Sequence, residues 1–126
     1  MKFSELNGAA VDVSQFKNKT VFVNVWATWC KPCIQEMPSI QHAKSLLATD
    51  EIVFLLASDD ESEQIERFKQ KHGYDLYYVK LDNLNELSIQ ALPTTFIFDG
   101  DGNLTFTETG YRQWDEPANL QLISEK

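Results

Sequence analysis

The run of residues 20–27, Thr-Val-Phe-Val-Asn-Val-Trp-Ala, constrains the fold more than any other part of the chain. It is dense in β-branched and aromatic residues and has little polar alternation, which is the pattern of a strand covered on both faces. Residues 51–57, Glu-Ile-Val-Phe-Leu-Leu-Ala, form a second run that reads as buried. With helical patterns in between, the two runs predict a layered α/β domain.

Helix and turn signals fill the rest of the chain. Apolar residues at helical spacing predict a helix over residues 33–48 that is kinked at Pro38, because proline removes one backbone hydrogen bond. The acidic residues 58–61 suit the start of a helix that stops near Gly73. Further on we expect a short strand at 76–81, a short helix at 83–91, a hairpin of strands 94–98 and 104–108, and a last helix at 116–124.

Length, composition and charge indicate one compact domain, which we expect to span residues 1–126. A chain of 126 residues can bury a core without disulfide staples, and 43% apolar with 24% charged residues is typical of a soluble globular protein. A net charge of −8 with no stripe of basic residues argues against a nucleic-acid partner. No window of 18 apolar residues occurs and residues 1–5 lack the core of a signal peptide, so we expect no membrane insertion by this chain. A signal or anchor upstream of Met1 stays an open question.

The chain holds two cysteines, and they lie three positions apart where a predicted strand gives way to a helix. Two cysteines cannot form a framework of structural disulfides, and a four-ligand metal site would need two further ligands. His42 and His72 lack the short spacing of zinc motifs. We therefore expect neither a metal nor another cofactor, and we interpret Cys30 and Cys33 as a redox pair.

The position of the pair at a helix start suits thiol chemistry. Unpaired N–H groups and the helix dipole favour a thiolate there, and the thiolate is the species that attacks a disulfide. Cys30, on the exposed edge of the turn, is predicted to be the nucleophile, and Cys33, one turn further in, to resolve the mixed disulfide. Pro32 fits the first helical turn and Lys31 adds a nearby positive charge. A static surface disulfide in a non-catalytic domain is the alternative.

Residues 25–33, Val-Trp-Ala-Thr-Trp-Cys-Lys-Pro-Cys, followed by Glu-Met-Pro at 36–38, resemble the signature of the TlpA-like branch of the thioredoxin superfamily, a branch of extracytoplasmic thiol-disulfide oxidoreductases. The likeness runs through most of the chain. It implies a thioredoxin fold, in which helices flank a central mixed β-sheet, with an N-terminal extension and a C-terminal β-hairpin plus helix. Residues 92–96, Leu-Pro-Thr-Thr-Phe, are similar to the family's loop with a cis proline facing the dithiol, so Pro93 is the expected cis proline.

The same resemblance assigns roles to further residues. Glu36 matches a glutamate implicated in that branch, and its spacing places it on the helical face of Cys33, where it can tune or deprotonate the thiol; a solvated surface glutamate is the alternative. Thioredoxins proper carry a buried aspartate where Asn24 stands, and an amide cannot exchange a proton. The backbone at Leu92 or Pro93 is expected to pair with a substrate strand. The expected binding positions are Trp29, Lys31, Pro32, Leu92 and Thr94.

The function implied by the resemblance is the reduction of protein disulfides by a monomer on the oxidising side of a membrane, with electrons from an upstream thiol donor. The compartment is periplasmic or otherwise extracytoplasmic, with an anchor possible in a segment absent from this chain, and some relatives act in cytochrome c maturation. A cytosolic thioredoxin-type reductase and a redox-inert binding module with the same fold are the alternatives. A peroxidase is disfavoured, because the motif lacks a lone peroxidatic cysteine in a Pro and Thr setting.

Three features near the C-terminus need separate interpretation. Residues 99–103, Asp-Gly-Asp-Gly-Asn, superficially resemble a calcium loop, but the positions required for the loop glycine and the bidentate acid hold Leu104 and Gly110, so we predict a hairpin turn. Trp114 is expected in the core against the last helix, rather than in a surface patch with Tyr111. Gly110, after the hairpin, resembles a groove-lining glycine of the fold, with a turn or a bulge as the alternative.

Overall fold

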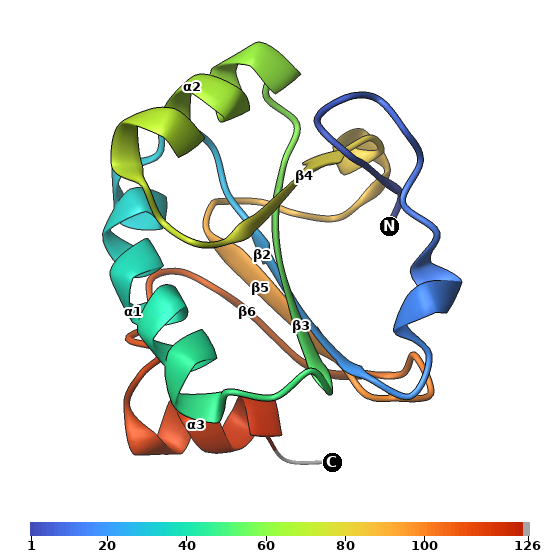
Figure 1. Cartoon of the computed structure of the whole chain (residues 1–126), viewed down its shortest axis with the longest axis vertical. Coiled ribbons are helices and arrows are strands. Elements are labelled where there is room, and N and C mark those ends of the chain that lie inside the picture. Colours follow the sequence, from blue (N-terminus) through green and yellow to red (C-terminus); the bar gives the residue numbers. More distant parts are fainter. Residues whose placement is uncertain (125–126) are drawn as a thin grey trace.

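A mixed six-stranded β-sheet forms the centre of the molecule, whose computed structural model describes residues 1–124 (Figure 1). In space the strands follow the order β1-β4-β3-β2-β5-β6. Strands β2, β3 and β4 run parallel to one another, whereas β1, β5 and β6 pair antiparallel with their neighbours. The bounds of the strands are β1 (Phe3–Ser4), β2 (Thr20–Val25), β3 (Ile52–Ser58), β4 (Tyr77–Leu81), β5 (Thr94–Phe98) and β6 (Leu104–Thr109). The two apolar runs are thus the two central strands, and the predicted α/β class is confirmed.

The helices begin and end where local signals place them. Helix α1 (Lys31–Leu47) continues through Pro38 as one helix. Helix α2 (Ser62–His72) starts from a reciprocal capping box between Glu61 and Gln64, and it ends at Gly73, whose φ of 67° lies in the left-handed region that favours glycine. The remaining helical elements are α3 (Pro117–Ser124) and the single turns η1 (Val13–Phe16) and η2 (Leu84–Glu86). Within residues 1–124, no helix has both the length and the apolar character needed to cross a membrane.

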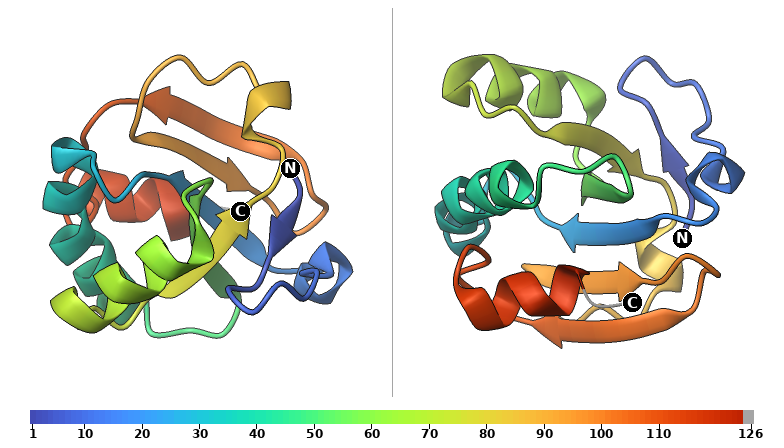
Figure 2. Two further views of the ribbon diagram at one scale, coloured as in Figure 1. Left: turned by 90° about the horizontal axis from the view of Figure 1, so that it is seen from above. Right: turned by 60° about the horizontal axis from the view of Figure 1, so that its bottom comes forward.

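All three α-helices lie on the same face of the sheet (Figure 2). The connections β2–α1–β3 and β3–α2–β4 step across the sheet in the same direction, and parallel crossovers are right-handed, so both put their helix on one side. Alternate residues of β2 serve the two faces. Phe22 and, just beyond the end of β2, Trp26 pack in the helix-side core, whereas Val23 and Val25 point to the other face.

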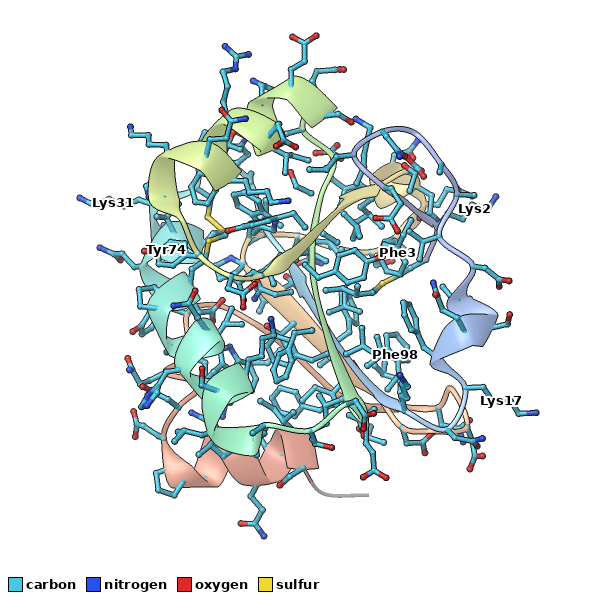
Figure 3. The ribbon with its side chains drawn as sticks, in the orientation of Figure 1. Lys2, Phe3, Lys17, Lys31, Tyr74 and Phe98 are labelled. Atoms are coloured by element: carbon cyan, nitrogen blue, oxygen red, sulfur yellow. A yellow bond between two sulfur atoms is a disulfide. The ribbon has the colours of Figure 1, made fainter. Side chains whose placement is uncertain are left out.

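The opposite face is covered by loops and single turns rather than by long helices. The N-terminal segment with η1 lies against it, as Figure 1 shows, and the residues after β4 add Leu84 and Leu87. A cavity of about 440 Å³ remains between the N-terminal segment and the sheet, with Phe3 and Phe98 on its wall (Figure 3). This face therefore has a thinner layer over the sheet than the helix side.

The helix predicted at residues 83–91 is wrong in extent, because η2 covers three residues only. Leu84 and Leu87 still pack inward, half-buried, as predicted. Two local features explain the short turn. The side chain of Asn83 accepts a hydrogen bond from the N–H of Lys2 at 2.8 Å, which ties the start of the segment to the N-terminus. At the other end the turn stops at Leu87, whose backbone is extended with φ of −101° and ψ of 146°.

We expect Ile40→Ala to lower the free energy of unfolding by about 2 to 5 kcal/mol, because Ile40 is completely buried under α1 and truncation leaves a cavity in the helix-side core. Leu46→Ala, on the same helix but 52% exposed, is the matched control and should change stability by less than about 1 kcal/mol. Denaturant unfolding followed by circular dichroism measures both variants. Equal losses in the two variants would contradict this packing.

Candidate active site

The cysteine pair sits where the loop after β2 enters α1, at the carboxyl end of the central parallel strands. The N–H of Trp26 donates to the carbonyl of Ala57 at 3.0 Å, which extends the β2–β3 pairing one step beyond the strand. The N–H of Cys30 then donates to the carbonyl of Ala27 at 3.1 Å and closes a tight turn. The chain therefore enters α1 directly from the edge of the sheet.

Cys30 and Cys33 form a disulfide across the first turn of α1, with their Cα atoms 5.3 Å apart. Cys30 is the N-cap residue of α1, and its Sγ accepts a hydrogen bond from the N–H of Cys33 at 3.3 Å. Both cysteines are buried, which corrects the expectation of an exposed Cys30, but Cys30 keeps 5% of its surface exposed whereas Cys33 has none, so Cys30 is the more accessible residue of the pair. The positive end of the α1 dipole favours a thiolate at this position.

The residues beside the cysteines differ in exposure. Trp29 has 75% of its surface exposed, the largest exposure among the big apolar side chains of residues 1–124. Lys31 points away from the protein into solvent (Figure 3) and Pro32 occupies the first helical turn, as expected. Trp29 is thus an apolar surface next to Cys30, while the charge of Lys31 is screened by water.

A second loop reaches the same end of the sheet. Val25 of β2 is paired with Thr94 of β5, which places Leu92 and Pro93 beside the exit of β2. The Leu92–Pro93 peptide bond is cis, which confirms the expectation for Pro93. Half-buried Leu92 packs against the core cluster that contains both cysteines, and the hydroxyl of buried Thr94 donates to the carbonyl of Ala91 at 2.6 Å.

Gly110 supports this loop from the neighbouring segment. Its N–H donates to the carbonyl of Pro93 at 2.7 Å, one step past the end of the β5–β6 pairing. Its φ of 112° is a backbone conformation that side chains rarely adopt. Gly110 therefore holds the proline loop in place.

Glu36 is a fully buried carboxylate, which rules out the alternative of a solvated helical glutamate. One oxygen, Oε1, accepts from Asn24 Nδ2 at 2.8 Å. The other, Oε2, accepts from the backbone N–H of Arg112 at 2.9 Å and from Trp114 Nε1 at 3.1 Å. Glu36 therefore joins α1 to β2 and to the segment that precedes α3.

Burial raises the pKa of Glu36 from 4.5 to about 7, because a charged carboxylate loses its hydration in the core. The hydrogen bonds from Arg112, Asn24 and Trp114 favour the charged form and offset part of that increase. A pKa near neutrality allows the group to take up or release a proton under ordinary conditions. The position is one helical turn from Cys33.

Asn24 occupies the centre of this network. Its Nδ2 also donates to the hydroxyl of Thr95 at 3.1 Å, so the amide connects β2 to both α1 and the strand that follows the proline loop. Its Oδ1 is buried and has no hydrogen-bond partner within residues 1–124. Besides lacking a proton to exchange, Asn24 thus has a structural task that the sequence did not indicate.

Sequence reasoning missed two residues of the site and part of the task of a third. Trp114 is in the core as predicted, but the sequence does not predict the hydrogen bond from its indole N–H to Glu36. Arg112 acts through its backbone N–H, for which a side-chain pattern gives no signal; its guanidinium lies over the rings of Phe106 and Trp114. Asp60, expected only as part of a helix start, accepts a hydrogen bond from the N–H of Thr28 at 2.8 Å. Within residues 1–124 no three His, Cys, Asp or Glu side chains gather as a metal site.

Comparisons with known proteins find relatives that are named thiol-disulfide oxidoreductases. The model of the Redoxin family matches residues 2–122. The thiol-disulfide oxidoreductase ResA of Geobacillus thermodenitrificans is 31% identical over 111 residues, and that of Bacillus subtilis 29% over 111 residues. These alignments cover 85% and 84% of this chain but 64% and 62% of the relatives, so the chain spans less than two thirds of their length.

Solved structures show the same fold. A thiol:disulfide interchange protein of the thioredoxin family from Chlorobium tepidum superimposes with a TM-score of 0.78 at 19% identity, over 98% of this chain and 92% of the other. The exposed lipoprotein thioredoxin of Streptococcus pneumoniae gives a TM-score of 0.82 at 22% identity, over 100% and 98%. The predicted thioredoxin fold is confirmed.

The pKa of Glu36 makes stability depend on pH in a defined direction. The folded protein holds the Glu36 proton up to about pH 7, whereas the unfolded chain releases it near 4.5. The folded state therefore binds more protons in this window, and the free energy of unfolding should fall by about 3 kcal/mol as pH rises from 4.5 to above 7. Glu36→Gln should remove that part of the slope, and Glu63→Gln, on the exposed side of α2, should not. Denaturant unfolding curves at several pH values measure how the free energy of unfolding depends on pH. The same dependence in wild type and in Glu36→Gln would refute the raised pKa of Glu36.

Proposed function

Because this chain belongs to the Redoxin family, we propose that it is a thiol-disulfide oxidoreductase that reduces protein disulfides through Cys30 and Cys33. The observation that carries the proposal is the asymmetry of the pair at the N-terminus of α1, where Cys30 is the N-cap residue and keeps 5% of its surface exposed while Cys33 has none. Dithiol exchange needs one cysteine that attacks the substrate disulfide and a second, less accessible cysteine that resolves the mixed disulfide.

The reaction follows from this arrangement in two exchanges. The Cys30 thiolate attacks one sulfur of a substrate disulfide, forms a mixed disulfide with it and releases the other sulfur as a thiolate. Cys33 then loses its proton, attacks Cys30 Sγ and releases the second substrate sulfur. Two electrons pass to the substrate, whose two sulfurs leave as thiols after protonation, and Cys30 and Cys33 end as a disulfide. Glu36, with its pKa of about 7, is the proposed acceptor of the Cys33 proton.

The proposed substrate surface lies between the two loops. Trp29 offers an exposed apolar ring beside Cys30. The pairing of Thr94 with Val25 places the cis-proline loop at the end of β2, from which the turn with Trp29 and Cys30 starts. An extended substrate segment can pair with the backbone of Leu92 and present its disulfide to Cys30, whereas Pro93 has no N–H and its carbonyl already accepts from Gly110. We keep Lys31, Pro32 and Thr94 as proposed contributors to this surface.

We propose that the enzyme works outside the cytoplasm, because residues 25–38 resemble the TlpA-like branch of extracytoplasmic oxidoreductases and one structural neighbour is an exposed lipoprotein thioredoxin. In this setting an upstream thiol protein restores the dithiol, and cytochrome c maturation is one pathway that uses such a reductant. We propose that residues 1–126 form a single domain that works as a monomer. A cytosolic thioredoxin-type reductase is the second candidate, and assay of the full-length gene product in cell fractions separates the two.

Cys33→Ser should accumulate mixed disulfides through Cys30, because the resolving sulfur is gone. Cys30→Ser is the matched control and should accumulate far fewer, since the remaining cysteine is buried. Non-reducing electrophoresis of each variant with a disulfide-containing protein substrate measures the complexes. If Cys30→Ser traps the substrate instead, the order of the two sulfurs is the reverse of the one proposed.

The reduction potential of the pair tests the direction of electron flow and the inert-module alternative. Equilibration with a glutathione buffer, followed by the fluorescence of Trp29 beside the disulfide, should give about −250 mV or lower, in the range of reductants. A value nearer about −120 mV would identify an oxidant. A pair that never equilibrates would support a redox-inert binding module.

A further inference from the structure

We infer that Asp60 is a positioning residue for the redox loop: its carboxylate accepts a hydrogen bond from the backbone N–H of Thr28 and so holds the turn before Cys30. The inference rests on the proposed function, because it concerns the reactivity of Cys30. It starts from a side-chain contact between two loops that are far apart in sequence: the N–H of Thr28 donates to Asp60 Oδ2 at 2.8 Å.

The contact replaces a backbone hydrogen bond that would otherwise continue the pairing of β2 with β3. Strands β2 and β3 are parallel, and alternate N–H groups of β2 face β3. Trp26 makes the last backbone bond of this series, to Ala57. The next N–H on that side belongs to Thr28, and it meets the Asp60 carboxylate instead of a backbone carbonyl. Asp60 thereby extends the β2–β3 connection to within two residues of Cys30.

Asp60 is itself held from two strands, so that it forms a fixed anchor. Its Oδ2 also accepts from the hydroxyl of Ser58 at 2.8 Å, and its own N–H donates to that hydroxyl at 3.0 Å. Lys80 on β4 donates from Nζ to the Asp60 carbonyl at 2.9 Å. Ser58 is fully buried, and Asp60 and Lys80 are half-buried. These contacts fix the orientation of the carboxylate independently of its hydrogen bond with Thr28.

The anchored residue controls where Cys30 lies. Thr28 and Trp29 are the two central residues of the turn that the bond from Cys30 to Ala27 closes. Cys30 follows directly as the N-cap of α1, where its sulfur faces the N–H of Cys33. A turn released from Asp60 can move this sulfur away from the helix end, and the thiolate then loses the stabilisation that the helix N-terminus provides.

The charge of Asp60 and its hydrogen bond predict opposite effects, which makes the inference testable. Removing a negative charge near Cys30 eases thiolate formation, whereas releasing the turn hinders it. Asp60→Asn and Asp60→Ala both remove the charge, but the asparagine keeps an oxygen that can accept from Thr28. The difference between these two variants therefore isolates the positioning.

The experiment measures the pH dependence of Cys30 alkylation by iodoacetamide in reduced protein carrying Cys33→Ser. We expect the midpoint of Asp60→Ala to lie at least about half a pH unit above that of Asp60→Asn, with alkylation at neutral pH several-fold slower. Asp59→Ala is the matched control, because Asp59 is exposed in the same loop, and its midpoint should equal that of the parent. Ser58→Ala removes a hydrogen bond to the Asp60 carboxylate but keeps its charge. Its alkylation midpoint should lie above that of the parent, and it replaces Asp60→Ala as the test if Asp60→Ala fails to fold.

Equal midpoints for Asp60→Ala and Asp60→Asn, or an unshifted Ser58→Ala where Asp60→Ala does not fold, would overturn the positioning role. Alkylation reports on Cys30 whether or not the protein reduces a substrate. Failure of the proposed reductase activity would therefore appear in the substrate assay alone and be distinct from failure of this inference.

Discussion

The buried carboxylate of Glu36 is the interaction on which the rest of the site depends. A carboxylate without water is costly unless donors surround it, and here the donors come from three places: the amide of Asn24 on β2, the backbone of Arg112 and the indole of Trp114. Satisfying the group thus requires α1, β2 and the chain after β6 to meet at one point. The helix that carries the cysteines is located by that requirement as well as by apolar packing.

The chemistry of the pair then arises from the end of the sheet rather than from any one loop. Three connections converge there: the turn after β2 that carries Cys30, the loop with Asp60 after β3, and the cis-proline loop before β5. Backbone bonds beyond the strand ends, from Trp26 to Ala57 and from Gly110 to Pro93, lengthen the ordered region into these loops. A sulfur at the tip of such a region can meet a substrate without the scaffold having to rearrange.

Much of this could be predicted from the sequence because it is local. The apolar runs define β2 and β3, the spacing of the cysteines at a helix start defines the dithiol, and the resemblance of residues 92–96 identifies the cis proline. The features that could not be predicted depend on contacts between residues far apart in the sequence. Asp60 is expected from the sequence only as part of a helix start, but its carboxylate reaches across to Thr28, and Arg112 contributes a backbone group that no side-chain pattern marks. The helix expected at 83–91 is one turn only, because Asn83 is tied to Lys2 at its start and the backbone is extended at Leu87, although Leu84 and Leu87 pack inward as their spacing predicted.

The one-sided placement of the helices has a consequence for how the chain can vary in evolution. The site network depends on the helix side, where a change of length in α1 or near Trp114 would break bonds to Glu36. The other side is covered by single turns and irregular segments at 5–19 and 82–91, which are connections of the kind that accept insertions and deletions. New binding surfaces can therefore be grafted on that side while the redox pair stays unchanged. The molecule separates the part that must keep its geometry from the part that is free to diversify.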